Sequence, residues 1–62
     1  MYIKIGDGLL SSCVDGMVKI TRYRSDARYL SPADAGLTVM KLRWLGIPME
    51  ILHEFELEKY GL

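Results

Sequence analysis

The strongest constraint on the fold of this chain is one helix whose two ends are marked by the residues around them. Ser31 can accept a hydrogen bond from the free amides of a helix start, the proline after it fits the first helical position, and Asp34 suits the positive end of the helix dipole. Gly46 tolerates the left-handed conformation that closes many helices, and Pro48 disfavours helical angles at the preceding residue. The sequence therefore predicts a helix over residues 32–45.

This predicted helix has apolar residues on two opposite sides. At about 100° per residue, the members of one strip fall within about 60° of one another and form the predicted core face. They are Ala33, Leu37, Met40 and Trp44. The second strip, roughly opposite, consists of Ala35, Val39 and Leu42. A single small sheet can cover only one side of a helix, so we expect the second strip to be available as a dimer interface.

Two segments before the helix have the pattern of strands. Residues 2–5 alternate between apolar and polar side chains, which is typical of a strand. Further on, Asp15 is followed by glycine, a strong signal for a two-residue hairpin turn, because both central residues of a type I′ turn need positive φ. We expect the hairpin to span residues 9–24 and to place Val14 opposite Met17.

The segment after the helix, MEILHEFELEKY over residues 49–60, is rich in helix formers, yet its apolar residues recur at alternate positions. A helix would scatter these residues around its whole circumference. A strand would place most of them on one side, with Leu52 as the one exception: Met49, Ile51, His53, Phe55 and Leu57. Because strand propensity mostly reflects how well a side chain packs on its face of the sheet, the alternation outweighs the composition and predicts a strand.

Together these elements predict a single α+β domain over residues 1–62. The order strand, hairpin, helix, strand closes most simply as a three- to four-stranded, mostly antiparallel sheet with one helix packed on one face. A chain of 62 residues has room for only a small core, although 50% of its residues are hydrophobic. Its single cysteine, Cys13, allows no internal disulfide. The excess of apolar residues therefore predicts a homodimer, formed through the second strip of the helix or through an exposed strand edge.

The net charge, the apolar segments and the cysteine content indicate what the protein can bind and in which compartment it is found. The formal net charge is zero, which argues against a general polyanion binder. We see no basic start followed by an apolar run of the kind that secretory signals have, and no apolar window long enough for a membrane span. With one cysteine and no cluster of metal-ligand spacing, we expect a cytoplasmic protein without membrane association, metal or cofactor.

Acidic residues form the first candidate binding site. The segment 46–62 contains four glutamates and one lysine. If residues 49–60 form a strand, the glutamates share its polar side, where alternate residues are spaced by roughly 6.6–6.8 Å. These glutamates are Glu50, Glu54, Glu56 and Glu58. Such a row of negative charge could occupy a basic groove on a partner protein. The alternative is a solvated strand face that protects a sheet edge.

A second candidate site is the basic and aromatic segment KITRYRSDARY, residues 19–29. It combines cations, which can bind phosphates, with flat rings, which can stack on bases. Its candidate residues are Lys19, Arg22, Tyr23, Arg24 and Arg28. Asp26 lies within the segment, and the chain has no net positive charge to attract a polyanion. The alternative is a solvated strand end that pairs with the glutamates.

Catalysis has little support in the sequence. His53 is the only histidine, and it lies among the apolar positions of the last predicted strand. A nucleophilic pair of Cys13 and His53 would need a third, orienting group, and the spacing suggests none. We therefore expect a non-enzymatic protein-binding module without a catalytic residue, a homodimeric regulator or inhibitor that occupies the surface of a protein partner. The alternative function is weak binding of single-stranded nucleic acid.

Overall fold

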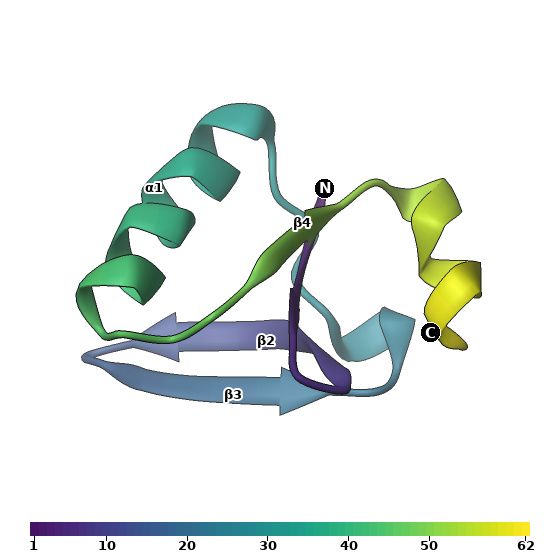
Figure 1. The fold of residues 1–62 in the computed structure, drawn as a ribbon, viewed down its shortest axis with the longest axis horizontal. Coiled ribbons are helices and arrows are strands. Elements are labelled where there is room, and N and C mark those ends of the chain that lie inside the picture. The colour runs from purple at the N-terminus through teal and green to yellow at the C-terminus, as the bar shows by residue number, and fades with distance from the viewer.

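The computed structural model describes residues 1–62 and confirms the predicted α+β class (Figure 1). Its elements are β1 (Tyr2–Ile5), β2 (Gly8–Val14), β3 (Met17–Thr21), the 3-10 helix η1 (Arg24–Asp26), α1 (Pro32–Trp44), β4 (Glu50–Leu52) and the 3-10 helix η2 (Glu54–Tyr60). The four strands form one antiparallel sheet in the order β3-β2-β1-β4. None of the helices has the length and hydrophobicity needed to cross a lipid bilayer.

The hairpin between β2 and β3 has the predicted turn and register. Asp15 and Gly16 have φ values of 52° and 76°, as a type I′ turn requires, and Val14 lies opposite Met17. The pairing ends at Thr21, so the return strand is three residues shorter than the predicted hairpin, which extended to residue 24. There the chain leaves the sheet and enters η1, whose turn is closed by a hydrogen bond from the Ala27 amide to the Arg24 carbonyl oxygen.

A β-bulge in β2 changes which side chains face the helix. Leu10 pairs with Ile20, but the next paired residue on β2 is Ser12, opposite Lys19. The extra residue, Ser11, reverses the alternation of side chains beyond it. Cys13 consequently lies on the same face of the sheet as Leu10 and packs against the same apolar cluster.

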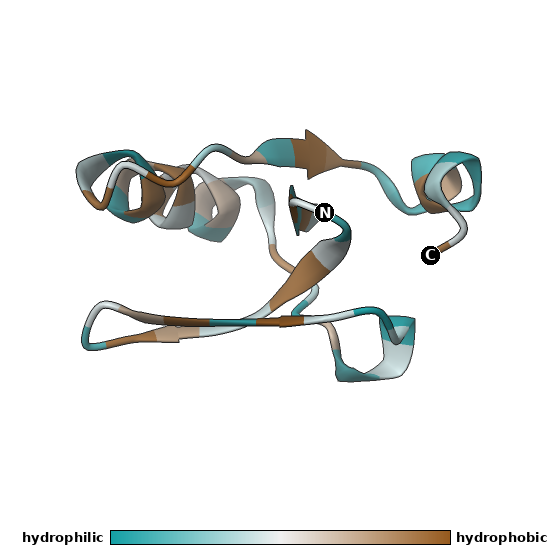
Figure 2. Ribbon diagram, turned by 60° about the horizontal axis from the view of Figure 1, so that its bottom comes forward, coloured by the Kyte–Doolittle hydropathy of each residue, from teal (hydrophilic) through white to brown (hydrophobic).

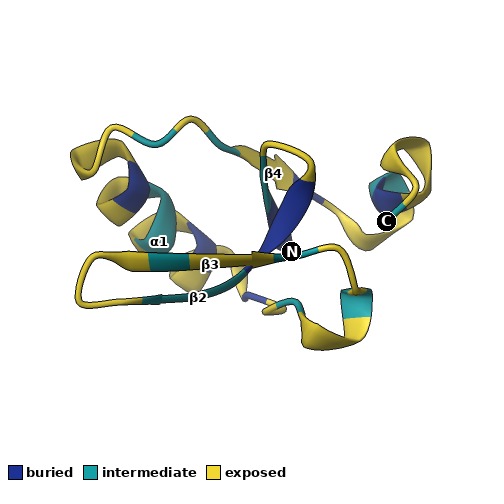
Figure 3. Ribbon diagram, turned by 90° about the horizontal axis from the view of Figure 1, so that it is seen from below, coloured by how far each residue is buried: buried dark blue, intermediate teal, exposed yellow.

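The small core is divided between the two faces of the sheet. On one face, α1 covers a cluster composed of Ile3, Leu10, Leu30, Ala35 and Leu42. On the other, η2 covers a cluster composed of Tyr2, Leu9, Leu52 and Leu57. Neighbouring residues such as Leu9 and Leu10 belong to different clusters because successive side chains of a strand point to opposite faces. Figure 3 shows the buried positions on the strands, on the sheet side of α1 and within η2.

Both ends of α1 have the capping interactions expected from the sequence. At the start, the Asp34 amide donates to Ser31 Oγ at 3.2 Å. At the end, Gly46 has φ of 73°, its amide donates to the Arg43 carbonyl oxygen, and the Ile47 amide donates to the Leu42 carbonyl oxygen. This pair of bonds is a Schellman motif, which satisfies carbonyl groups that the last helical turn leaves free.

The predicted core face of α1 is wrong, and the two strips exchange roles. Ala35 and Leu42, which were expected at a dimer interface with Val39, are 1% and 0% exposed in the core, and Val39 packs beside them. The cause lies in the capping motifs. Leu30, just before the N-cap, shares a cluster with Ala35, as in a hydrophobic staple, and Ile47 packs on the cluster that contains Leu42. Both ends therefore turn the same side toward the sheet.

The strand predicted over residues 49–60 is also wrong beyond Leu52. β4 pairs with β1 from Glu50, opposite Lys4, to Leu52, opposite Tyr2. β1 begins at Tyr2, and the residue before it exchanges two backbone hydrogen bonds with Leu30 instead. An extended chain after Leu52 would therefore have no neighbouring strand to satisfy its amides and carbonyl groups. The segment coils into η2 instead, which brings Leu57 over the second cluster.

Two glycines give opposite predictions for stability. Gly36 lies within α1, and an added Cβ would meet no atom within 4 Å, so Gly36→Ala should stabilise the domain by about 0.5–1 kcal/mol. Gly46, with its positive φ, has equally open surroundings, but alanine there would be strained, and Gly46→Ala should destabilise by about 1 kcal/mol. Urea unfolding of both variants measures the two changes. A destabilising effect of Gly36→Ala would contradict the placement of this residue in a helix interior.

Candidate functional site

The side of α1 that faces away from the sheet carries the strip that had been predicted as core. We call it the outer face of α1, and it consists of Ala33, Leu37, Met40 and Trp44. Trp44 is 91% exposed, and Leu37 and Met40 are also mostly exposed. Figure 2 shows hydrophobic residues along α1, interleaved with hydrophilic ones. In the single chain, these side chains are covered only in part.

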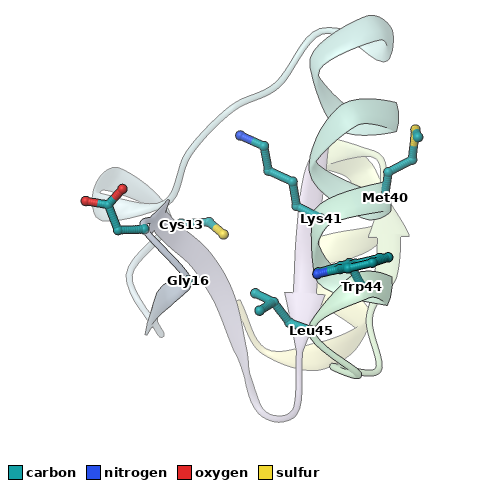
Figure 4. A pocket seen from close by; sticks show the side chains of 7 residues that line it. Cys13, Gly16, Met40, Lys41, Trp44 and Leu45 are labelled. Atoms are coloured by element: carbon teal, nitrogen blue, oxygen red, sulfur yellow. The ribbon is translucent and has the colours of Figure 1, made fainter.

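A cavity of about 450 Å³ adjoins the outer face. It lies between the second half of α1, which contributes Met40, Lys41 and Trp44, and the tip of the β2–β3 hairpin, which contributes Asp15. Cys13, Gly16 and Leu45 complete its lining. In Figure 4, Lys41 extends from the helix toward the hairpin. Met40 and Trp44 thus belong both to the exposed strip and to the rim of a cavity.

A smaller cavity of about 130 Å³ continues beside the first half of the helix. Among its lining residues are Asp34 and Leu37 of α1, and it shares Cys13 and Lys41 with the larger cavity. One long edge of the outer face is therefore bordered by cavities and carries an acidic residue near the helix start and a basic residue near its end.

The four glutamates of the acidic candidate do not form a row on one strand. Only Glu50 lies on a strand, opposite Lys4. Glu54 and Glu58 are exposed on η2, while the Glu56 carboxylate accepts a hydrogen bond from the His53 amide at 3.0 Å and so caps the start of that helix. The predicted acidic strand surface is thereby corrected.

The residues of the basic and aromatic candidate site lie in several separate parts of the structure. Arg22 donates to the Asp7 carbonyl oxygen at 3.1 Å, and Arg24 donates to the main-chain oxygen of Leu62 at 2.7 Å. Lys19 is exposed on β3, and Tyr23 is exposed before η1. Arg28 lines the smaller cavity. Two of the four cations are therefore hydrogen-bonded to main-chain oxygens of distant segments. Binding of single-stranded nucleic acid, the alternative function, stays a prediction.

The two side chains considered for catalysis lie in different surroundings. His53 stacks on Phe55, with ring centroids 5.5 Å apart, at the start of η2. Cys13 is half-buried under α1 and lines both cavities. No group of three or more His, Cys, Asp or Glu side chains is arranged to hold a metal ion.

Sequence periodicity missed the outer face as a surface because both strips of α1 are apolar. The signal that could have identified it is the pair of capping motifs, which assign Ala35 and Leu42 to the core and leave Trp44 outside. Comparison with protein-family models, with curated proteins and with solved structures returns no match to this chain.

Proposed function

We propose that this chain is a protein-binding module whose binding surface is the outer face of α1. The observation that carries the proposal is Trp44, a large aromatic side chain that is 91% exposed at the edge of a 450 Å³ cavity and in line with Leu37 and Met40. Tryptophan is among the residues that contribute most to protein interfaces when it is buried on binding.

The apolar area of the outer face can supply the free energy of binding. Fully burying a side chain such as Leu37 or Met40 contributes about 1.5–3 kcal/mol, and the aromatic ring of Trp44 brings a larger area. In the single chain most of this free energy is not gained, because Leu37, Met40 and Trp44 are 60%, 67% and 91% exposed. A contiguous apolar strip with a polar border is the arrangement that marks interaction sites.

The border of the strip favours a protein over a lipid partner. Asp34 and Lys41 lie along one edge, and Arg43 lies along the other. Helices that bind membrane surfaces carry predominantly basic residues on their polar side, since they face anionic lipids. A border of both signs instead suits a surface with complementary charges of its own.

The role that fits this surface is that of a small regulator or inhibitor, which acts by occupying the surface of a partner. This role needs no catalytic group in the chain. It also does not depend on the glutamates of η2, because the apolar strip supplies the contact area and the cavity offers room for a partner side chain.

Trp44→Ala tests the proposal. In affinity capture from the cells that produce the chain, we expect proteins retained by the wild-type chain to be reduced roughly 10- to 30-fold by this substitution, as for a residue that dominates an interface. Quantitative mass spectrometry measures the ratio, and circular dichroism checks that the variant is folded.

Phe55→Ala is the matched control, because Phe55 is another exposed aromatic residue, 78% exposed, and lies on η2. It should leave the retained amounts within about twofold of wild type, as expected for a residue outside the interface. Equal loss with both variants, or no loss with Trp44→Ala, would contradict the outer face as the binding surface.

A further inference from the structure

We propose that the partner of the outer face is a second copy of this chain, with the two α1 helices packed antiparallel around a twofold axis. The inference rests on the proposed function, since it names the partner of the same surface: the protein that capture should then retain is a second copy of this chain. The inference is carried by the spacing of apolar, small and charged residues along α1. This pattern on one helix complements the same pattern on a second helix only when the two are antiparallel.

The apolar residues match in pairs around one centre. In a twofold antiparallel pair, residues equally far from the centre meet. With the centre midway between Leu37 and Met40, each of these residues meets the other in the second copy. The same centre lies midway between Ala33 and Trp44, so the largest side chain of the strip lies over the smallest. Large-on-small packing of this kind lets two helices approach closely.

The charged edge matches around almost the same centre. Asp34 and Lys41 are seven residues apart on α1, so they differ by about 20° in direction and lie on one edge of the outer face. A twofold axis brings this edge against itself with its direction reversed. Asp34 of each copy then lies beside Lys41 of the other, offset by about 3 Å along the helix. Lys41 is exposed and flexible, so its ammonium can cover this offset.

The opposite edge of the outer face also fits the second copy without a steric clash. It carries Gly36 and Arg43, which are again seven residues apart. In the antiparallel pair, Arg43 lies beside Gly36 of the second copy, where no side chain competes for the space and an added Cβ would meet nothing in the single chain. The apolar strip and both edges therefore share one centre to within about one residue of helical rise.

A parallel arrangement of the two helices lacks this complementarity. It would place the edge with Asp34 and Lys41 against the opposite edge of the second copy, so that Lys41 lies near Arg43 and Asp34 lies near glycine. Like charges at an interface oppose association, and Asp34 gains no basic partner. It would also align the two helix dipoles. The charges thus select the antiparallel orientation, while the apolar strip supplies the attraction.

Reversing charges one at a time and then mixing the variants tests the orientation directly. Asp34→Lys alone leaves two lysines facing each other at both edge contacts, and Lys41→Asp alone leaves two aspartates. We expect each variant to self-associate at least about tenfold more weakly than wild type. In an equimolar mixture, every edge contact joins a lysine to an aspartate, so we expect association to return to within about threefold of wild type. Sedimentation equilibrium of the 7.1 kDa chain at micromolar concentration measures all three.

Arg43→Asp is the matched control, because it makes the same charge change as Lys41→Asp, two residues further along α1 but on the edge that faces glycine. It should leave self-association within about threefold of wild type, as expected for a rim charge without a partner. Recovery in the mixture also excludes unfolding as the cause of the single losses, because two unfolded chains would not restore a dimer.

The outcomes separate this inference from the proposed function. A wild-type monomer that still captures other proteins through Trp44 would overturn the self-pairing and leave the binding surface intact. Self-association that is lost in Trp44→Ala but is indifferent to the charge variants would overturn the antiparallel register alone. Self-association that is indifferent to Trp44→Ala would overturn the self-pairing and would point to another surface, such as the free edge of β3, while the capture experiment would still decide the proposed function.

Discussion

Substitution of Leu57 with aspartate is expected to unfold the domain. Leu57 is fully buried in the cluster between η2 and the sheet. The change removes an apolar side chain whose loss alone costs about 2–5 kcal/mol and adds the cost of burying a carboxylate without a partner. A chain of 62 residues has a total stability of only about 3–9 kcal/mol at typical values per residue. Far-UV circular dichroism with urea titration measures the loss.

Phe55→Asp is the control for this prediction, and it also decides the structure of the segment. In η2, Phe55 is exposed and only stacks on His53, so the variant should lose no more than about 0.5 kcal/mol. In an extended strand, Phe55 and Leu57 would share the apolar side of the sheet. Similar losses in the two variants would therefore favour the strand over the 3-10 helix.

Leu42→Ala is the second substitution with a large expected effect. Leu42 is fully buried against the strands, so truncation should leave a cavity and destabilise the domain by about 2–5 kcal/mol. In a domain of this size, that corresponds to a fall in melting temperature of roughly 10–40 °C. Thermal unfolding followed by circular dichroism at low micromolar concentration, where self-association is least populated, gives the value.

Leu37→Ala makes the same chemical change on the other side of α1. Leu37 is mostly exposed, so we expect a change within about 0.5 kcal/mol. Periodicity alone predicts the reverse, because it assigns Leu37 to the core and Leu42 to an interface. A larger loss in Leu37→Ala than in Leu42→Ala would show that the outer face of α1 is the side that packs on the sheet.

The sequence correctly predicted the elements that are determined by residues close to one another in the chain. The turn at Asp15 follows from the need for positive φ at two successive residues, and its register follows from the turn. The start of α1 follows from the Ser31 cap and the proline after it, and its end follows from Gly46. Each of these depends on a few neighbouring residues, so tertiary packing had little freedom to change them.

The candidate sites were predicted less well, because they depend on contacts between residues that are far apart in the sequence. The alternation in residues 49–60 correctly predicts β4, but only as far as Leu52, where β1 offers its last partner at Tyr2. The glutamates beyond that point were therefore assigned to a strand face that does not form, and Glu56 caps η2 instead. How far a strand extends depends on its neighbour, which no pattern within the strand records.

The sequence by itself thus determined the α+β class, the hairpin turn and the boundaries of the helix, because each is a response of the backbone to its own side chains. Only the tertiary structure decided which side of α1 is buried and where the last strand ends. Both depend on contacts with distant residues: Leu42 meets a cluster built from β1 and β2, and Leu57 covers Tyr2 and Leu9. The exposed Trp44 is the consequence of that choice, because a small sheet can cover only one of two apolar sides of a helix.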